Sequence, residues 1–200
     1  MKWFNIIRFG NCAEGSLSLG EGELTNTEPW ALMAHTPINV WSVPTLRGID
    51  PKENGPPDDT VVNHLGLPIF SPRLQRALEN ETNAKIQYLP VRIVRCSGEL
   101  LEGFAIANVL DARCALDRNR ARFSLFPDDY FLQDRRGKIS GIQRIVLIGE
   151  ALSGAELIRL EEYGATLLCS ERIKRIFDNN QFTGWRFDPV EVGYAGNGDN

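Results

Sequence analysis

A stretch near the end of the sequence repeats a stretch 99 residues earlier, and this repeat constrains the fold more than any other feature. The register holds without a gap from Ser71 and Ser170 to Val91 and Val190, and six of these 21 aligned positions are identical. About one identity would be expected from ordinary composition. The identical pairs are Ser71/Ser170, Arg73/Arg172, Arg76/Arg175, Asn80/Asn179, Pro90/Pro189 and Val91/Val190.

Both copies show the same succession of patterns. An apolar run is followed by a serine that can cap a helix, and apolar residues then recur at the spacing of one helix face. A second, roughly alternating run ends each copy. We therefore predict an α+β fold with a mostly antiparallel or mixed sheet and two related strand–helix–strand modules, at about residues 65–91 and 164–190. The alternative is a chance similarity between two amphipathic helices.

The patterns elsewhere predict further strands and leave one segment ambiguous. Residues 151–162 fit either a helix with a capping box at Ser153 and Glu156 or a hairpin arm, and we favour the strand. The composition of residues 10–27 indicates a loop. The other strands are expected at residues 2–9, 38–43, 65–70, 85–95, 101–110 and 143–148, with residues 85–110 forming a hairpin.

Length and composition suit a protein of one or two domains. With 200 residues, 42% of them hydrophobic, the chain can bury a proper core. We expect residues 1–60 to add strands and loops to the same domain, residues 61–192 to form the α+β domain with both copies, and residues 193–200 to be a disordered tail. The sequence has no signal-peptide pattern and no membrane-spanning apolar run, so a cytoplasmic location is expected.

Charge and ligand residues argue against several classes of function. The net charge of −4 disfavours a non-specific nucleic-acid binder, which needs a basic face. The cysteines form no CxxC pair, and the histidines have no second ligand at metal-binding spacing. We therefore expect no disulfide framework, no metal site and no cofactor. These residues are Cys12, Cys96, Cys114, Cys169, His35 and His64.

Two alternatives to a binding protein stay open. The arginine-rich residues 113–122 could bind phosphate in nucleic acid, although such charge runs usually form a solvated surface. An enzyme such as a hydrolase is the other alternative. The sequence contains no GxSxG, P-loop, HExxH or dinucleotide fingerprint, so we expect no catalytic residues. The arginines of the segment are Arg113, Arg118, Arg120 and Arg122.

Three motifs within residues 60–191 resemble one known family. They are Tyr88-Leu89-Pro90-Val91, Ala107-Asn108-Val109-Leu110 leading to Ala115-Leu116-Asp117, and Ser170 through Thr183-Gly184-Trp185-Arg186-Phe187. Together they resemble the immunity-protein-eleven family of bacterial polymorphic toxin systems. The resemblance implies an α+β cytosolic protein that is encoded beside a toxin and protects its producer by binding that toxin, often a nuclease. It carries over no catalytic residue.

Neutralising a toxin requires a complementary surface rather than catalysis. The binding energy of such a surface concentrates in a few aromatic and arginine anchors. Carboxylates could also occupy the basic phosphate site of a nuclease and speed the encounter. The predicted partner-binding residues combine aromatic and acidic side chains: Trp30, Asp58, Asp59, Asp128, Asp129, Tyr130, Phe131 and Asp134. Trp41 is a further candidate, although core packing is the commoner role of a tryptophan in a strand.

Overall fold

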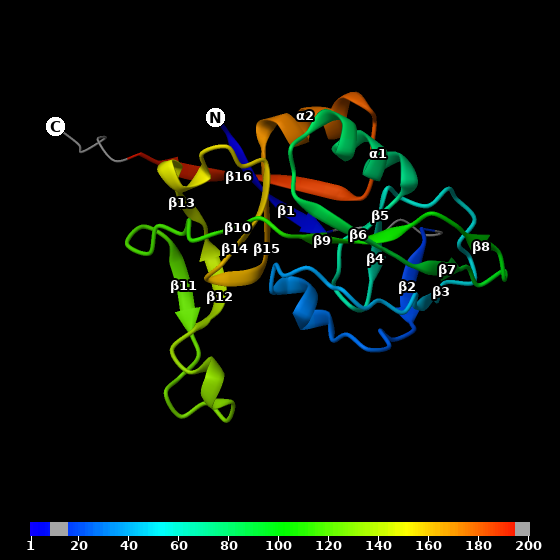
Figure 1. Cartoon of the computed structure of the whole chain (residues 1–200), viewed down its shortest axis with the longest axis horizontal. Coiled ribbons are helices and arrows are strands. Elements are labelled where there is room, and N and C mark those ends of the chain that lie inside the picture. The colour runs from blue at the N-terminus through cyan, green and yellow to red at the C-terminus, as the bar shows by residue number, and fades with distance from the viewer. Residues whose placement is uncertain (9–15, 195–200) are drawn as a thin grey trace.

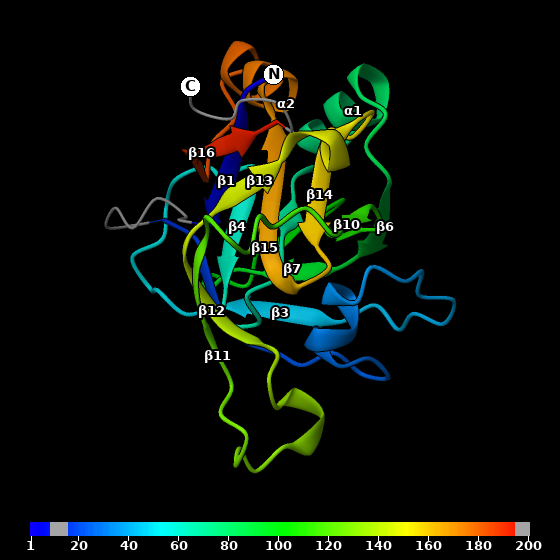
Figure 2. The ribbon, with the colours of Figure 1, turned by 90° about the vertical axis from the view of Figure 1, so that its left-hand side faces the viewer.

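The computed structural model describes residues 1–8 and 16–194 as two curled sheets, two short helices and a projecting two-stranded arm (Figures 1 and 2). The helices lie side by side at one end of the molecule, and the arm extends from the other end. Strands far outnumber helices. The architecture is therefore roughly α+β with mixed sheets, as the sequence predicts.

The first sheet has six strands and is built mainly from the C-terminal half of the chain. Its centre, however, is the first strand of the protein, which pairs antiparallel with a strand on each side. Both edge strands pair parallel with their neighbours, so the sheet is mixed. In spatial order the strands are β10 (Ala112–Arg113), β14 (Leu157–Leu160), β15 (Tyr163–Ser170), β1 (Trp3–Arg8), β16 (Trp185–Gly193) and β13 (Val146–Ile148).

The second sheet has eight strands and curls back on itself. Two strands that are separated only by Val91 in the chain, β6 and β7, occupy the first and seventh places in the sheet. Because β6 and β7 are adjacent in the chain, these two places in the strand order must lie close together in space. The sheet must therefore be strongly bent. In spatial order the strands are β6 (Ile86–Pro90), β9 (Ala105–Val109), β5 (Ile69–Phe70), β4 (Thr60–Asn63), β2 (Ser18–Glu21), β3 (Thr45–Gly48), β7 (Arg92–Val94) and β8 (Leu100–Leu101).

The two helices are α1 (Pro72–Glu81) and α2 (Glu171–Asn179). Ser71 caps α1, because its hydroxyl accepts a hydrogen bond from the backbone N–H of Leu74 at 3.3 Å. Pro72 follows at the first helical position, where a missing N–H leaves no bond unmade. No helix in the described residues has the length and apolar character needed to cross a bilayer.

The strands around the two helices pair in the same register. In the N-terminal half, Phe70 of β5 and Pro90 of β6 both lie opposite Ala105 of the intervening β9. In the C-terminal half, the residues 99 positions later, Cys169 and Pro189, both lie opposite Phe4 of the intervening β1. The strand orders β4–β5–β9–β6 and β14–β15–β1–β16 are therefore alike. We call these two sets of strands, with α1 and α2, the N-terminal unit and the C-terminal unit.

An acidic residue ties the beginning of α1 to the chain beyond α2. The carboxylate of Asp59 accepts hydrogen bonds from Nε and Nη2 of Arg73, both at 2.6 Å, and from the backbone N–H of Thr183 at 3.0 Å. Nη2 of Arg73 also donates to the carbonyl oxygen of Gln181 at 3.0 Å. The Ser71 hydroxyl completes the network by donating to Asp59 at 2.6 Å. We call this network the Asp59 clasp.

A second acidic residue makes the reciprocal connection. The carboxylate of Glu156 accepts from Nη1 of Arg172 at 3.0 Å and from the backbone N–H of Asn83, just beyond α1, at 2.5 Å. Nη2 of Arg172 donates to the carbonyl oxygen of Glu81, the last residue of α1. We call this network the Glu156 clasp. Each helix is thus joined near its first residues to the C-terminal end of the other.

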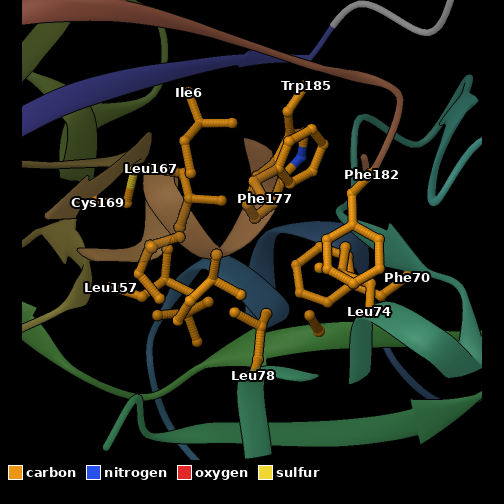
Figure 3. Packing of buried hydrophobic residues seen from close by; sticks show 14 of the residues in the cluster. Ile6, Phe70, Leu74, Leu78, Leu157, Leu167, Cys169, Phe177, Phe182 and Trp185 are labelled. Carbon is orange, nitrogen blue, oxygen red and sulfur yellow. The ribbon is translucent and has the colours of Figure 1, made fainter. Parts of the chain in front are cut away.

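One apolar core lies between the helices and both sheets (Figure 3). It combines Leu74 and Leu78 of α1 with Phe177 of α2, and all three are buried. Trp185 stacks on Phe177 with ring centroids 5.4 Å apart and meets Phe70 edge-on at 5.2 Å. Because both units contribute side chains to this cluster, a substitution that disturbs packing in one unit should also destabilise the other.

Several predicted elements are confirmed. The strand at residues 2–9 is β1, the first predicted helix is α1, and residues 85–110 form a hairpin in which β6 pairs with β9 and β7 with β8. Residues 151–162 contain β14, which confirms the strand interpretation after the 3-10 helix η3 (Gly149–Leu152). Gly193 ends β16, and residues 195–200 of the expected tail lie outside the described residues.

The strand predicted at residues 38–43 is wrong. This segment is fixed by side chains instead of a strand ladder, because the Gln87 amide bonds both the N–H and the carbonyl oxygen of Ile38. The indole of Trp41 donates to the carbonyl oxygen of Pro90 at 2.9 Å. The strand nearby is β3, which begins only after Pro44.

Other boundaries also differ from prediction. The strand expected at residues 65–70 is reduced to β5, since Gly66 adopts a positive φ of 64° in a turn. The strands expected at 85–95 and 143–148 are interrupted at Val91 and Ile145. The loop expected at residues 10–27 contains β2, while residues 9–15 lie outside the described residues.

Candidate partner-binding surface

A two-stranded arm projects from the body on the side opposite the helices (Figures 1 and 2). Its strands are β11 (Arg122–Leu125) and β12 (Ile139–Arg144), which pair antiparallel as a sheet of their own. Residues 126–138 form the arm tip and include the 3-10 helix η2 (Gln133–Arg135). Most of the residues predicted to bind a partner lie on this tip.

Aromatic rings pack against one another along the arm tip, and the outermost ring, Phe131, is open to solvent. The ring centroid of Tyr130 lies 4.6 Å from that of Phe126 and 4.6 Å from that of Phe131. Phe131 is 76% exposed, and the neighbouring Leu132 is exposed as well. A group of apolar side chains left in water on a projection is typical of a binding surface.

Polar contacts fix the conformation of the arm tip. The N–H of Phe126 donates to the carbonyl oxygen of Lys138 at 2.9 Å, and Nε of Arg136 donates to that of Tyr130 at 2.7 Å. The guanidinium of Arg135 lies 5.9 Å from the centroid of the Phe126 ring. Because the tip is ordered before it meets a partner, less conformational entropy is lost on binding.

The acidic residues predicted for this region lie on the same tip. Asp128, Asp129 and Asp134 are all exposed, and they flank the aromatic pair Tyr130 and Phe131 in the sequence. The structure therefore brings five of the eight predicted partner-binding residues together on one projection.

The base of the arm is anchored to β16. Glu191 of this strand accepts hydrogen bonds from the guanidinium of Arg120 and from Nη2 of Arg144, the latter at 2.6 Å. The guanidinium of Arg118 lies 5.2 Å from the centroid of the Phe123 ring on β11. These contacts fix the direction in which the arm leaves the body.

The arginine-rich residues 113–122 do not act as one patch. Arg113 bonds to Asp111 through Nε at 2.6 Å, and this hydrogen bond raises the pKa of Arg113. Arg118 and Arg120 make the separate contacts at the base of the arm described above. Three of the four arginines therefore have distinct intramolecular partners.

Asp59 lies inside the protein, which corrects its prediction as a partner-binding residue. The residue is 3% exposed, and its carboxylate is occupied by the Asp59 clasp. The preceding Asp58 is half-buried, and a side chain at Gly184 would come within 3.2 Å of its Cβ. Both aspartates belong to the helix side of the molecule, away from the arm tip.

Trp30 belongs to a second group of exposed apolar side chains. It lies in the 3-10 helix η1 (Pro29–Met33) and is 65% exposed, while Val40 in the same loop is 71% exposed. The amide of Asn26 donates to the hydroxyl of Ser42 at 3.0 Å and draws the ends of this loop together. In Figures 1 and 2, η1, drawn in blue, lies on the arm side of the molecule.

Groups suited to metal binding or nucleophilic catalysis are not gathered in the described residues. Among residues 1–8 and 16–194, no three histidine, cysteine, aspartate or glutamate side chains are placed to hold a metal ion. Burial raises the pKa of the Cys169 thiol, and a hydrogen bond to Glu162 raises that of Cys114. Both shifts disfavour the thiolate that a nucleophile requires.

One open pocket of about 470 Å³ lies beside the Glu156 clasp. Trp3, Tyr194 and Asn83 are among its lining residues. Of the described lining residues, Glu156 alone carries a carboxylate, and Arg172 already engages it. The pocket therefore offers no pair of acid and base groups for general acid–base catalysis.

Comparison with known families decides the class of protein. A family model described as Immunity protein family (Imm11) matches residues 23–192 of the 200-residue chain. The chain belongs to this family. The family resemblance drawn from the sequence is therefore confirmed. No curated protein matches the chain. The Imm11 match includes the arm, η1 and both clasps, so every surface discussed above lies within the family's own region.

Sequence reasoning missed the arm of this Imm11 protein as a unit. The sequence nevertheless carried a signal, since two short apolar patterns around Phe123 and Ile142 flank a segment that starts with Pro127 and ends near Gly137. Such an arrangement is typical of a hairpin with a long loop. The basic residues Arg136 and Lys138 that accompany the acidic tip were also missed.

Proposed function

We propose that this Imm11 protein binds and neutralises a cognate toxin of a bacterial polymorphic toxin system, in the cytoplasm and without catalysing a reaction. Membership of an immunity protein family supports a toxin-immunity role. The observation that carries the proposal is the pre-ordered arm tip, on which the half-buried Tyr130 packs against the exposed Phe131. Rigid aromatic side chains of this kind act as anchors in protein interfaces.

A projection can inhibit an enzyme by entering its cleft or by covering its entrance. A stable interface buries on the order of 800 Å² on each partner, which is more than the arm tip alone would supply. The 3-10 helix η1, which carries the exposed Trp30, lies on the same side of the molecule and extends the proposed contact. We therefore assign the arm tip as the main contact and η1 as the second.

The carboxylates of the arm tip suit a nuclease as the toxin. The phosphate-binding site of a nuclease is basic, and Asp128, Asp129 and Asp134 are exposed where they could enter it. Opposite charges accelerate the encounter, most strongly at low ionic strength. Neutralising these three aspartates should therefore slow association with a nuclease toxin.

Binding to the toxin domain encoded next to this gene tests the proposal. The double variant Tyr130→Ala, Phe131→Ala should weaken binding by at least tenfold and abolish protection of cells that express the toxin domain. Leu100→Ala is the matched control, because Leu100 is an exposed apolar residue on β8, outside the arm. Equal affinities for the double variant and the wild-type protein would refute the arm tip as the contact.

We also propose that the N-terminal and C-terminal units are related copies that together form a rigid scaffold for the arm. The sequence repeat, the shared pairing register and the reciprocal clasps support this relation. A rigid base matters to a binder, because freedom of the arm would have to be lost on association.

A further inference from the structure

The charge of the arm differs from that of the rest of the protein. Residues 117–144, which comprise the arm and its base, contain seven arginines and lysines but four aspartates, a net charge of +3. The whole chain has a net charge of −4, so the remainder carries −7. The arm is therefore a basic projection on an acidic body.

Five cations of this region have no ion pair within the described residues, and all are exposed. They are distributed from the base of the arm to its tip, because Arg122 begins β11 and Lys138 immediately precedes β12. We call this set the cation strip. Its members are Arg118, Arg122, Arg135, Arg136 and Lys138.

Two members of the cation strip, Arg122 and Lys138, differ from the cations that hold the arm in place. Arg120 and Arg144 are committed to Glu191, so their charges are balanced within the protein. Arg122 and Lys138, in contrast, form no ion pair or side-chain hydrogen bond within the described residues and face water. Exposed charges that are not paired within the protein are suited to steering an encounter.

We propose that the cation strip docks against an acidic surface of the toxin that flanks the cleft entered by the arm tip. This inference rests on the proposed function and adds the charge of the surface that the toxin presents. A protein partner suits the arm better than a nucleic acid, because Asp128, Asp129 and Asp134 lie beside the cations and would repel phosphates. The acidic body would repel a polyanion as well.

Association kinetics with the toxin domain encoded next to this gene test the inference. The double variant Arg122→Glu, Lys138→Glu should reduce the association rate constant about tenfold at low ionic strength, with the difference shrinking as salt is added. The matched control is Arg76→Glu, Arg175→Glu, which changes the net charge equally at exposed positions of α1 and α2, on the opposite side. Unchanged melting temperatures establish that both variants fold.

Each outcome has a definite meaning. Slower association of the arm variant alone supports the inference, whereas equal rates for the arm variant and wild type, or equal slowing by both variants, overturn it. Salt-sensitive retention of RNA or DNA by the wild-type protein, lost in the arm variant, would overturn it in favour of a nucleic-acid contact. If the wild-type protein forms no complex with the toxin domain, the proposed function fails. If it binds but the arm variant behaves normally, the inference alone fails.

Discussion

The N-terminal and C-terminal units both use a carboxylate to join the two helices, but with different side chains. In each, a carboxylate accepts from an arginine of the following helix and from a backbone N–H beyond the other helix. The Asp59 side chain is 5% exposed and has Ser71 as an additional donor, whereas that of Glu156 is 12% exposed. The comparison teaches that equivalent geometry need not mean equal energy, because the number of donors and the degree of burial set the contribution.

Substitutions at equivalent core positions of the two units should show the largest difference in stability. Trp185 of the C-terminal unit is 8% exposed, while the residue 99 positions earlier, Ile86, is half-buried at the edge of the cluster. Trp185→Ala should lower the free energy of unfolding by about 4 kcal/mol, and Ile86→Ala by about 1 kcal/mol. Urea unfolding followed by circular dichroism measures both, and equal losses would contradict the asymmetry.

Removing the carboxylate of each clasp should destabilise the protein by different amounts. Asp59→Ala leaves the Thr183 N–H and the Ser71 hydroxyl without their acceptor in a buried site, and should cost about 3 kcal/mol. Glu156→Ala should cost about 1 kcal/mol, because its partner Arg172 is 49% exposed and can be hydrated. Chemical denaturation of both variants checks the order. A larger loss for Glu156→Ala would show that burial does not govern these networks.

A glycine marks a further point at which the units differ. Gly184 has a φ of 98°, and a Cβ there would lie 2.3 Å from the carbonyl oxygen of Thr60. Gly184→Ala should therefore destabilise the protein by about 2 kcal/mol, because both the backbone conformation and the contact are unfavourable. The exposed Lys85, 99 residues earlier, should tolerate alanine within about 0.5 kcal/mol. Thermal melts compare the two, and a neutral Gly184→Ala would contradict the close approach to Thr60.

The smallest difference concerns the two cap serines. Ser71→Ala removes a cap to Leu74 and a bond to Asp59, and should cost about 1 kcal/mol. The Ser170 hydroxyl is buried and has no hydrogen-bond partner among the described residues, so Ser170→Ala should be neutral or slightly stabilising. Melting temperatures that fall equally in both variants would show that Ser170 has a partner.

The sequence predicted the parts of the fold that depend on local patterns. The spacing of apolar residues after Ser71 predicts α1, and the turn at Gly98, with its φ of 89°, supports the hairpin on either side. The strand predicted around Trp41 is wrong, because this segment with alternating apolar residues is a loop. Hydrogen bonds from Gln87, which lies on a distant strand, hold the loop in place. Long-range side-chain hydrogen bonds of this kind produce no periodic pattern in the sequence from which they could be predicted.

The candidate surface was predictable only in part. The adjacent aromatic and acidic residues Tyr130, Phe131, Asp128 and Asp129 are the composition expected of a binding loop, and they lie on the arm tip. Asp59 looks identical to Asp58 in the sequence, yet the carboxylate of Asp59 is the one buried against the Arg73 guanidinium, while Asp58 is half-buried. Burial of that kind is set by tertiary structure, which a solitary acidic pair does not reveal.

The position of β1 at the centre of the six-stranded sheet has a consequence for how the protein is made. Its neighbours β15 and β16 are synthesised long after it, whereas the equivalent strand β9 follows both of its neighbours at short range. A ribosome-bound nascent chain can therefore pair β9 early, while β1 must wait for the final strand. Until β15 and β16 are made, both edges of β1 are unpaired and open to pairing with other molecules.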